Sequence, residues 1–250
     1  GMEGRGFNRV HVRTYLNSEV TAESIRRSKS FLEKAAVEYT FVLFIAGHGM
    51  RGRDNLAAYY YLTHESDPEN LKRTSVEYSQ IEGLLQGIAP RSKLFLMDTC
   101  ESGEAEEGMV EDVSKRARGL GLRGRAVEFG PRGFRVKSSA GVRGRAYLWQ
   151  RDRFIYNILA RRSGAVVFSA SRGGEYSFER DSLQNGVFTR VIIEALKGRK
   201  ADRDRDGQVS VDELRDYVSR KVSRMTGGLQ NPSVDRDNLY QKFGFSPAVP

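Results

Sequence analysis

The sequence predicts an α/β fold, a three-layer sandwich built around a mostly parallel central sheet. Strand-like and helix-like segments alternate along the chain, which is typical of parallel sheets joined by crossover helices. Two short runs, residues 41–46 and 94–97, are wholly apolar and are typical of strands buried on both faces. A length of 250 residues is enough for one such layered unit with a substantial core. We therefore expect one domain over residues 1–250.

The first half of the chain is expected to alternate further strands with two helices. Residues 8–16 alternate in the manner of a strand, and residues 57–63 are rich in strand formers. Thr21 can cap a helix that runs to about Ala36. Apolar residues at helical spacing predict a second helix over residues 76–87, ahead of the buried strand.

The second half begins with a segment of different character. Residues 101–146 are rich in glycine and show no convincing period, so we expect a long loop insertion there. Regular structure then resumes with a helix over 147–161 and a strand over 165–170. Helices are expected again over 186–197 and 211–222.

Composition excludes a membrane protein. Hydrophobic residues make up 39% and charged residues 29% of the chain, as in soluble globular proteins, and no apolar run approaches the roughly 20 residues that span a bilayer. The N-terminus has no apolar core of the kind found in secretory signals. With one cysteine, Cys100, and no signal, we expect a reducing, cytoplasmic location.

The candidate site lies where the two buried strands end. The strand at 93–98 leads into Asp98, Thr99 and Cys100, and the strand at 41–46 leads into Gly47-His48-Gly49. If the strands are parallel neighbours, both carboxyl ends open onto one edge of the sheet, which is where ligands bind in open α/β sheets. A cysteine and a histidine brought there, each on a glycine-relieved turn, are the parts of a thiolate–imidazole pair.

These motifs resemble a family. A strand with Gly-His-Gly, followed about fifty residues later by a strand with Asp-Thr-Cys-Glu-Ser-Gly, resembles the caspase-like cysteine peptidases: caspases, metacaspases and their bacterial relatives, and more distantly legumain. Segments 166–171 and 185–189 are similar to the same group. The resemblance covers about residues 8–245 and implies the caspase-like sandwich. That family opens with a central strand and a helix before the strand matching 8–16, and residues 1–7 are too few to supply them.

The resemblance implies a role for each residue at the strand ends. Cys100 would be the nucleophile and His48 the general acid and base, with the backbone amides of Gly49 and Cys100 as donors to the oxyanion. No cofactor is required for this chemistry. Taken singly, Cys100 could equally be a buried structural thiol, and His48 a turn histidine with a satisfied hydrogen bond.

Asp98 is the candidate for substrate specificity. It stands two residues before Cys100 on one strand, so both side chains are expected on the same face. An acid at this position in metacaspases and legumain-like enzymes helps form the S1 pocket, and metacaspases cut after Arg or Lys, so the resemblance implies peptide or protein substrates with a basic P1 residue. Glu175 or Glu179 could add to the pocket. The alternative is that Asp98 caps a turn.

The net charge of +9 is concentrated in one segment, because residues 115–145 contain ten basic residues and one acid, Glu128. Three interpretations remain open for this basic insertion. It could be a solvated loop, or it could contact nucleic acid or another anionic surface, although aromatic residues for stacking are few. It could also be a site of self-cleavage, since it follows the nucleophile of a protease expected to cut after Arg or Lys.

An acidic loop at 202–213 matches the twelve-residue EF-hand calcium loop by position, with acids at 1, 3, 5 and 12 and glycine at 6. The predicted Ca²⁺ ligands are Asp202, Asp204, Asp206, the backbone carbonyl of Gln208, and Glu213. Arg203 and Arg205 are expected to point to solvent. The alternative is a polar turn in which Ser210 and Glu213 form a capping box.

The sequence thus predicts a cysteine endopeptidase. Two other functions stay open. One is a catalytically silent member of the same fold that serves as an interaction module, and the other is a basic protein that binds anions or nucleic acid through the insertion.

Overall fold

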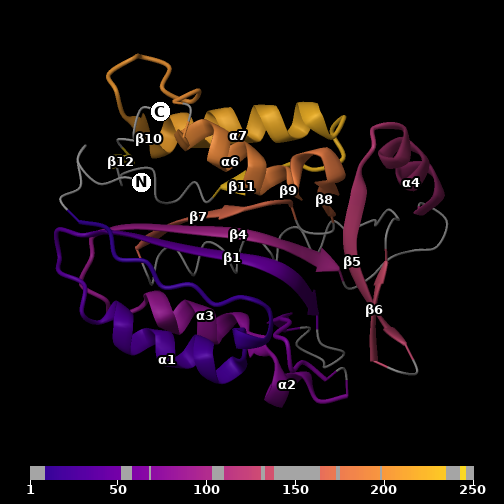
Figure 1. Ribbon diagram of the computed structural model, residues 1–250, viewed down its shortest axis with the longest axis horizontal. Coiled ribbons are helices and arrows are strands. Elements are labelled where there is room, and N and C mark those ends of the chain that lie inside the picture. Colours follow the sequence, from indigo (N-terminus) through magenta and orange to yellow (C-terminus); the bar gives the residue numbers. More distant parts are fainter. Residues whose placement is uncertain are drawn as a thin grey trace.

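The computed structural model describes residues 9–51, 58–67, 69–102, 110–130, 133–137, 164–172, 175–197, 199–234 and 243–245. Its centre is a six-stranded sheet in the order β11-β7-β4-β1-β2-β3 (Figure 1). The three longest strands run parallel to one another, whereas the three short ones pair antiparallel. The predicted mostly parallel sheet is confirmed. Its strands are β1 (Thr40–Arg51), β2 (Tyr59–Tyr61), β3 (Val76–Glu77), β4 (Ser92–Ser102), β7 (Ala165–Ser169) and β11 (Ser233–Val234).

Helices cover both faces of this sheet, which gives the three predicted layers (Figure 1). One layer holds α1 (Ala22–Leu32), α2 (Leu71–Thr74) and α3 (Tyr78–Leu85); the other holds α6 (Val187–Lys197) and α7 (Val211–Met225). Within β4, Phe95 and Met97 pack into the core on the α3 side, and Leu94 and Leu96 pack into the core on the α6 and α7 side. Because this part of β4 is buried on both faces, residues 94–97 carry no polar side chain.

Side-chain caps fix where two of the helices begin. Thr21 Oγ1 accepts a hydrogen bond from the backbone amide of Ser24 at 3.0 Å, as the sequence predicted, although α1 ends at Leu32, four residues earlier than expected. At α7, Ser210 Oγ accepts from the amide of Glu213 at 3.2 Å. Side-chain acceptors at these positions satisfy amides that the first helical turn leaves without partners.

The strand predicted for residues 8–16 is wrong over its described part. Residues 9–16 form no strand and lead into a short 3₁₀ helix, η1 (Asn17–Glu19). Alternation normally marks one face packed on a core, but here Val12 is 78% exposed and Leu16 is 63% exposed. Among the described residues, the edge of β1 away from β4 is paired only at Gly49–Arg51, by β2.

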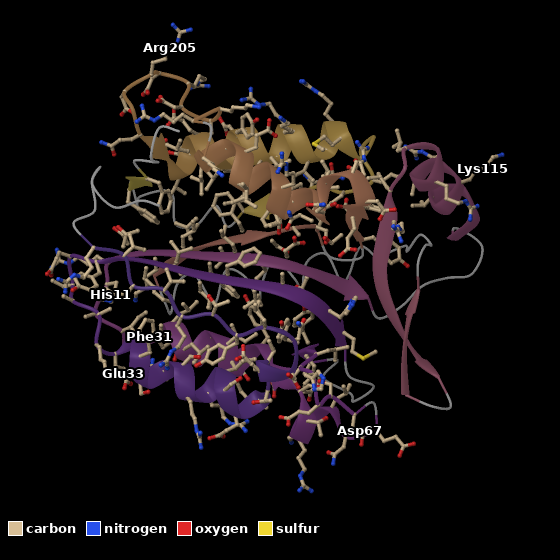
Figure 2. All side chains as sticks on the ribbon, viewed as in Figure 1. His11, Phe31, Glu33, Asp67, Lys115 and Arg205 are labelled. Atoms are coloured by element: carbon tan, nitrogen blue, oxygen red, sulfur yellow. The ribbon has the colours of Figure 1, made fainter. Side chains whose placement is uncertain are left out.

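The predicted loop at 101–146 contains regular structure, so that expectation is also wrong. It includes α4 (Val110–Gly119), β5 (Arg123–Gly130) and β6 (Gly133–Lys137), and Lys115 on α4 extends away from the molecule (Figure 2). Ala117 and Leu122 anchor the start of the segment in the core beside α6 and α7. A second sheet follows, in the order β6-β5-β8-β9, with β8 (Ser177–Arg180) and β9 (Asn185–Gly186).

The remaining elements are small. They are η2 (Asp181–Leu183) and the antiparallel pair β10 (Val209–Ser210) and β12 (Gly244–Phe245). The helix expected at 147–161 lies outside the described residues. In the part of the chain that the structure describes, no helix combines the length and the apolar character needed to cross a membrane.

Candidate active site

The predicted catalytic residues are neighbours at the carboxyl end of the parallel sheet. The register of β1 and β4 pairs Thr40 with Ser92 and continues to His48 opposite Cys100. His48 is half-buried. Parallel pairing over the whole length of both strands therefore brings the two residues together from positions 52 apart in the sequence.

The glycines around His48 have a different role from the one the sequence suggested. The expected turns are absent, because β1 and β4 stay paired beyond the candidate residues, to Met50 opposite Ser102. Gly47 has a φ of 154°, which residues with side chains rarely adopt, and a Cβ there would lie 3.1 Å from the Tyr61 ring. A Cβ at Gly49 would overlap the Tyr59 hydroxyl. Glycine is required because aromatic rings of β2 cover this strand end.

The two tyrosines bind the strands they cover. Tyr61 Oη donates to the carbonyl of Ala46 at 3.0 Å, and Tyr59 Oη donates to Thr99 Oγ1 at 2.7 Å. Thr99 is buried and directly precedes Cys100. A residue just before each member of the candidate pair is thus bonded to β2, and this helps fix the backbone that presents His48 and Cys100.

Asp98 is a buried carboxylate held by two hydroxyl groups. Its side chain is 1% exposed, and it lies within β4, so the turn-capping alternative does not apply. Ser177 Oγ donates to Asp98 Oδ1 at 2.9 Å, and Thr189 Oγ1 donates to Asp98 Oδ2. A buried carboxylate needs such donors, because an uncompensated charge is costly away from water.

Sequence reasoning missed Ser177 and Thr189 as partners of Asp98. Ser177 opens β8, and Thr189 lies in the first turn of α6. Thr189 is in the segment 185–189 that the resemblance picked out, so its hydroxyl was available as a signal. Ser177 lies in no segment that the sequence analysis singled out, between the two candidate acids Glu175 and Glu179. Gln230 holds β8 in place, since its Oε1 accepts from the amide of Phe178 at 3.0 Å and its Nε2 donates to the carbonyl of Ala170 at 2.8 Å.

The other two acids predicted for the pocket have different surroundings. Glu175 accepts hydrogen bonds from the backbone amide of Asn231 at 2.7 Å and from its side-chain amide at 2.9 Å, which ties it to the segment after α7. Burial raises the pKa of Glu175, against the opposing effect of these hydrogen bonds. Glu179 is exposed, two residues beyond Ser177 on β8. Of the three acids, Asp98 alone is bonded to both β8 and α6 in the described structure.

The acidic loop brings three of its predicted metal ligands together. Asp202, Asp204 and Asp206 each place a carboxylate oxygen within 4.8 Å of the others. Asp202 Oδ1 is buried and has no hydrogen-bond partner within the described chain. Glu213 forms the capping box with Ser210, and its Oε1 also accepts from the Arg203 amide at 2.7 Å. The side chain of Gln208 is exposed. Figure 2 shows Arg205 extending outward from the loop, as predicted.

Comparison with known proteins gives a consistent result. The profile of the peptidase C14 family, described as the caspase domain, matches residues 2–244. Among solved structures, protein GSU0716 from Geobacter sulfurreducens is similar in fold, with a TM-score of 0.52 and 14% sequence identity over 95% of this chain and 83% of that chain. None of the curated proteins compared with the sequence matches it.

Proposed function

Since this chain belongs to the caspase-domain family of cysteine peptidases, we propose that it hydrolyses peptide bonds after arginine or lysine, with Cys100 as nucleophile and His48 as acid and base. The observation that carries the proposal is the register of β1 and β4, which puts His48 beside Cys100 at the carboxyl edge of the sheet. Paired positions on adjacent strands are a suitable arrangement for a thiolate–imidazole pair.

The proposed reaction has two halves. The Cys100 thiolate attacks the scissile carbonyl carbon, and the amides of Gly49 and Cys100 stabilise the oxyanion. The C–N bond then breaks as His48 gives a proton to the leaving amine, and the acyl group remains on sulfur as a thioester. Water attacks the thioester and gives a proton to His48, the C–S bond breaks, and the carboxylic acid leaves as the Cys100 thiolate and protonated His48 are restored.

Basic P1 specificity is supported by the setting of Asp98. Ser177 and Thr189 both donate to its carboxylate, which leaves the group acceptor-rich and oriented next to the strand end that holds Cys100. A guanidinium or ammonium group is the P1 chemistry that a carboxylate at this strand end would attract. Glu179, exposed on the same strand as Ser177, could add a second acid to the approach.

Fluorogenic peptides that differ only at P1, carrying Arg, Lys, Asp or Asn, test the proposal. Hydrolysis after Arg or Lys that disappears in Cys100→Ala and in His48→Ala is the expected result. Hydrolysis after Asp would keep the peptidase and overturn the role given to Asp98. A folded protein that cleaves none of the peptides, and whose Cys100 resists iodoacetamide, would instead be a silent interaction module.

We also propose that the 202–213 loop binds Ca²⁺ in a structural role. Three carboxylates already converge there, and the buried Oδ1 of Asp202 lacks a hydrogen-bond donor within the described residues. β10 lies within the loop and pairs with β12, with Val209 opposite Phe245. This pairing supports the loop in the way that a second EF-hand would otherwise do.

Thermal unfolding with CaCl₂, MgCl₂ and EGTA tests this metal site. Ligand at a hundredfold excess over its dissociation constant adds about 2.7 kcal/mol of stability, so a clear rise in Tm with CaCl₂ is expected. Asp204→Asn should remove the rise, whereas Asp212→Asn, at a position in the same loop outside the carboxylate cluster, should keep it. An unchanged Tm of the wild type in CaCl₂ would overturn the site.

A further inference from the structure

Strand β8 has a neighbour along each edge in the described structure. On one side β9 pairs with Glu179 and Arg180. On the other side β5 runs antiparallel, with Arg123 opposite Glu179 and Arg125 opposite Ser177. A strand with two partners has no free row of amides and carbonyls to offer to a further extended peptide.

β8 is also the strand that a substrate would be expected to join. Extended peptides commonly bind by adding a strand to an existing sheet edge, where main-chain hydrogen bonds give affinity and side-chain pockets give specificity. Ser177, at the start of β8, donates to Asp98 at 2.9 Å, so β8 runs directly from the proposed specificity pocket. A peptide with its P1 side chain at Asp98 would therefore lie along β8, in the place that β5 holds.

β5 has the chemistry of such a substrate. It contains Arg123 and Arg125 in its paired stretch, and it contacts the ends of both β1 and β4, the strands that carry His48 and Cys100. Figure 1 shows β5 crossing beyond the carboxyl ends of these two strands. The register puts Arg125 at the same level as Ser177, the residue bonded to Asp98.

We propose that β5 is an internal blocking strand, which occupies the substrate position along β8 and keeps the peptidase latent until it leaves. The proposal rests on the peptidase function proposed above. It also assigns the basic segment a role beyond charge, because a strand rich in arginine matches a pocket built on an acid.

The attachment of β5 to β8 is suited to release. In the part of the chain that the structure describes, three residue pairs join the two strands, from Arg123 to Arg125. An ion pair between Arg123 and Asp181 lies beside this pairing, and both of its side chains are more than half exposed, at 58% and 77%. Exposed ion pairs contribute little to stability. Leu122, just before this stretch, packs into the core and would keep the chain anchored when the strand detaches beyond it.

Reaction rates of Cys100 test the block. The probes are two peptidyl chloromethyl ketones, with Arg or with Asp at P1, and iodoacetamide, which is too small to need the strand position; labelling is followed by intact mass. Gly124→Pro places a proline ring in the middle of the β5–β8 pairing, where a paired strand tolerates it poorly. Gly133→Pro is the control. It makes the same substitution in β6, at the far end of the pairing with β5, and Gly133 does not pair with β8. Asp181→Asn provides a milder second variant that removes only the ion pair.

Gly124→Pro is expected to react with a peptidyl reagent at least tenfold faster than wild type and Gly133→Pro, with the iodoacetamide rate unchanged. Asp181→Asn should shift the same rate by a smaller factor. Equal peptidyl rates in wild type and Gly124→Pro would overturn the proposal. The two proposals fail separately: acceleration only with the Asp reagent would keep the blocking strand and overturn basic P1 specificity.

Amide hydrogen exchange gives a readout that does not depend on the variants. In wild-type protein labelled to completion at Cys100 by either peptidyl reagent, residues 123–125 should lose protection while residues 177–180 keep theirs, because the inhibitor replaces β5 as the partner of β8. Retained protection at 123–125 in the labelled protein would show that substrate binds elsewhere and would also overturn the proposal.

Discussion

Replacing Thr189 by valine should impair hydrolysis after arginine far more than it impairs the reactivity of Cys100. The change removes the hydroxyl that donates to Asp98 Oδ2 and nearly preserves the shape of the side chain. Hydrogen bonds to charged groups contribute about 1.5–3 kcal/mol each. If that loss is felt in the positioning of the P1 side chain, kcat/KM for an Arg peptide should fall roughly 10- to 150-fold.

The measurement compares kcat/KM for Arg and Asp peptides, the rate of iodoacetamide labelling, and the free energy of unfolding in urea. Thr226→Val is the control, since Thr226 is a buried, hydrogen-bonded threonine, with partners in Val222 and Gln230, that makes no hydrogen bond to Asp98. Both variants should lose stability. Only Thr189→Val should lower the ratio of Arg to Asp hydrolysis.

Ser177→Ala, which removes the bond to Asp98 Oδ1, should give a similar loss of Arg hydrolysis. Because both hydroxyls act through Asp98, neither should matter once Asp98 is replaced by alanine. A Thr189→Val enzyme that is destabilised like Thr226→Val and yet keeps its preference for Arg would refute the reasoning. Asp98 would then be a structural acid.

Three further predictions concern the surroundings of the site. Burial raises the pKa of Glu175 above its ordinary value of 4.5, so ionisation of this group costs stability as the pH rises through that range. In urea unfolding, Glu175→Gln should therefore be more stable than wild type at pH 8 but not at pH 4. An equal difference in the free energy of unfolding at both pH values would contradict the assignment. Gln230→Leu leaves the Phe178 amide and the Ala170 carbonyl without their buried partner, and should lower the free energy of unfolding by about 2–6 kcal/mol; a loss below 1 kcal/mol would mean that water or another group replaces it. Incubated wild-type protein should cut itself after Arg or Lys within residues 113–146, as seen by intact mass, and the same cut in Cys100→Ala would show that a contaminating protease made it.

The sequence predicted the centre of the fold because burial on both faces leaves a direct mark. The runs at 41–46 and 94–97 became β1 and β4, and their parallel pairing brought His48 to Cys100 as expected. The glycines beside His48 were misread as turn residues. Their actual cause is the close approach of Tyr59 and Tyr61, a contact between strands that no local pattern records.

Other failures have equally physical reasons. Alternation at residues 9–16 predicts a strand only if a neighbouring strand accepts its hydrogen bonds, and none does among the described residues. Glycine-rich composition concealed α4 and the β5–β6 pair. The bonds from Ser177 and Thr189 to Asp98 span 79 and 91 positions of sequence, and side-chain pairing at that distance depends on the finished fold.

The central place of β4 has a consequence for any break in the chain that follows it. β4 pairs with β7 from Lys93 to Met97, and side chains of both strands share one core with α6 and α7. A nick between residues 103 and 164 would therefore divide the polypeptide but not the sheet. The two fragments would be detected as one complex in native mass spectrometry and would separate only in denaturant. The fragment carrying His48 and Cys100 would still depend on the other fragment for both hydroxyls that hold Asp98.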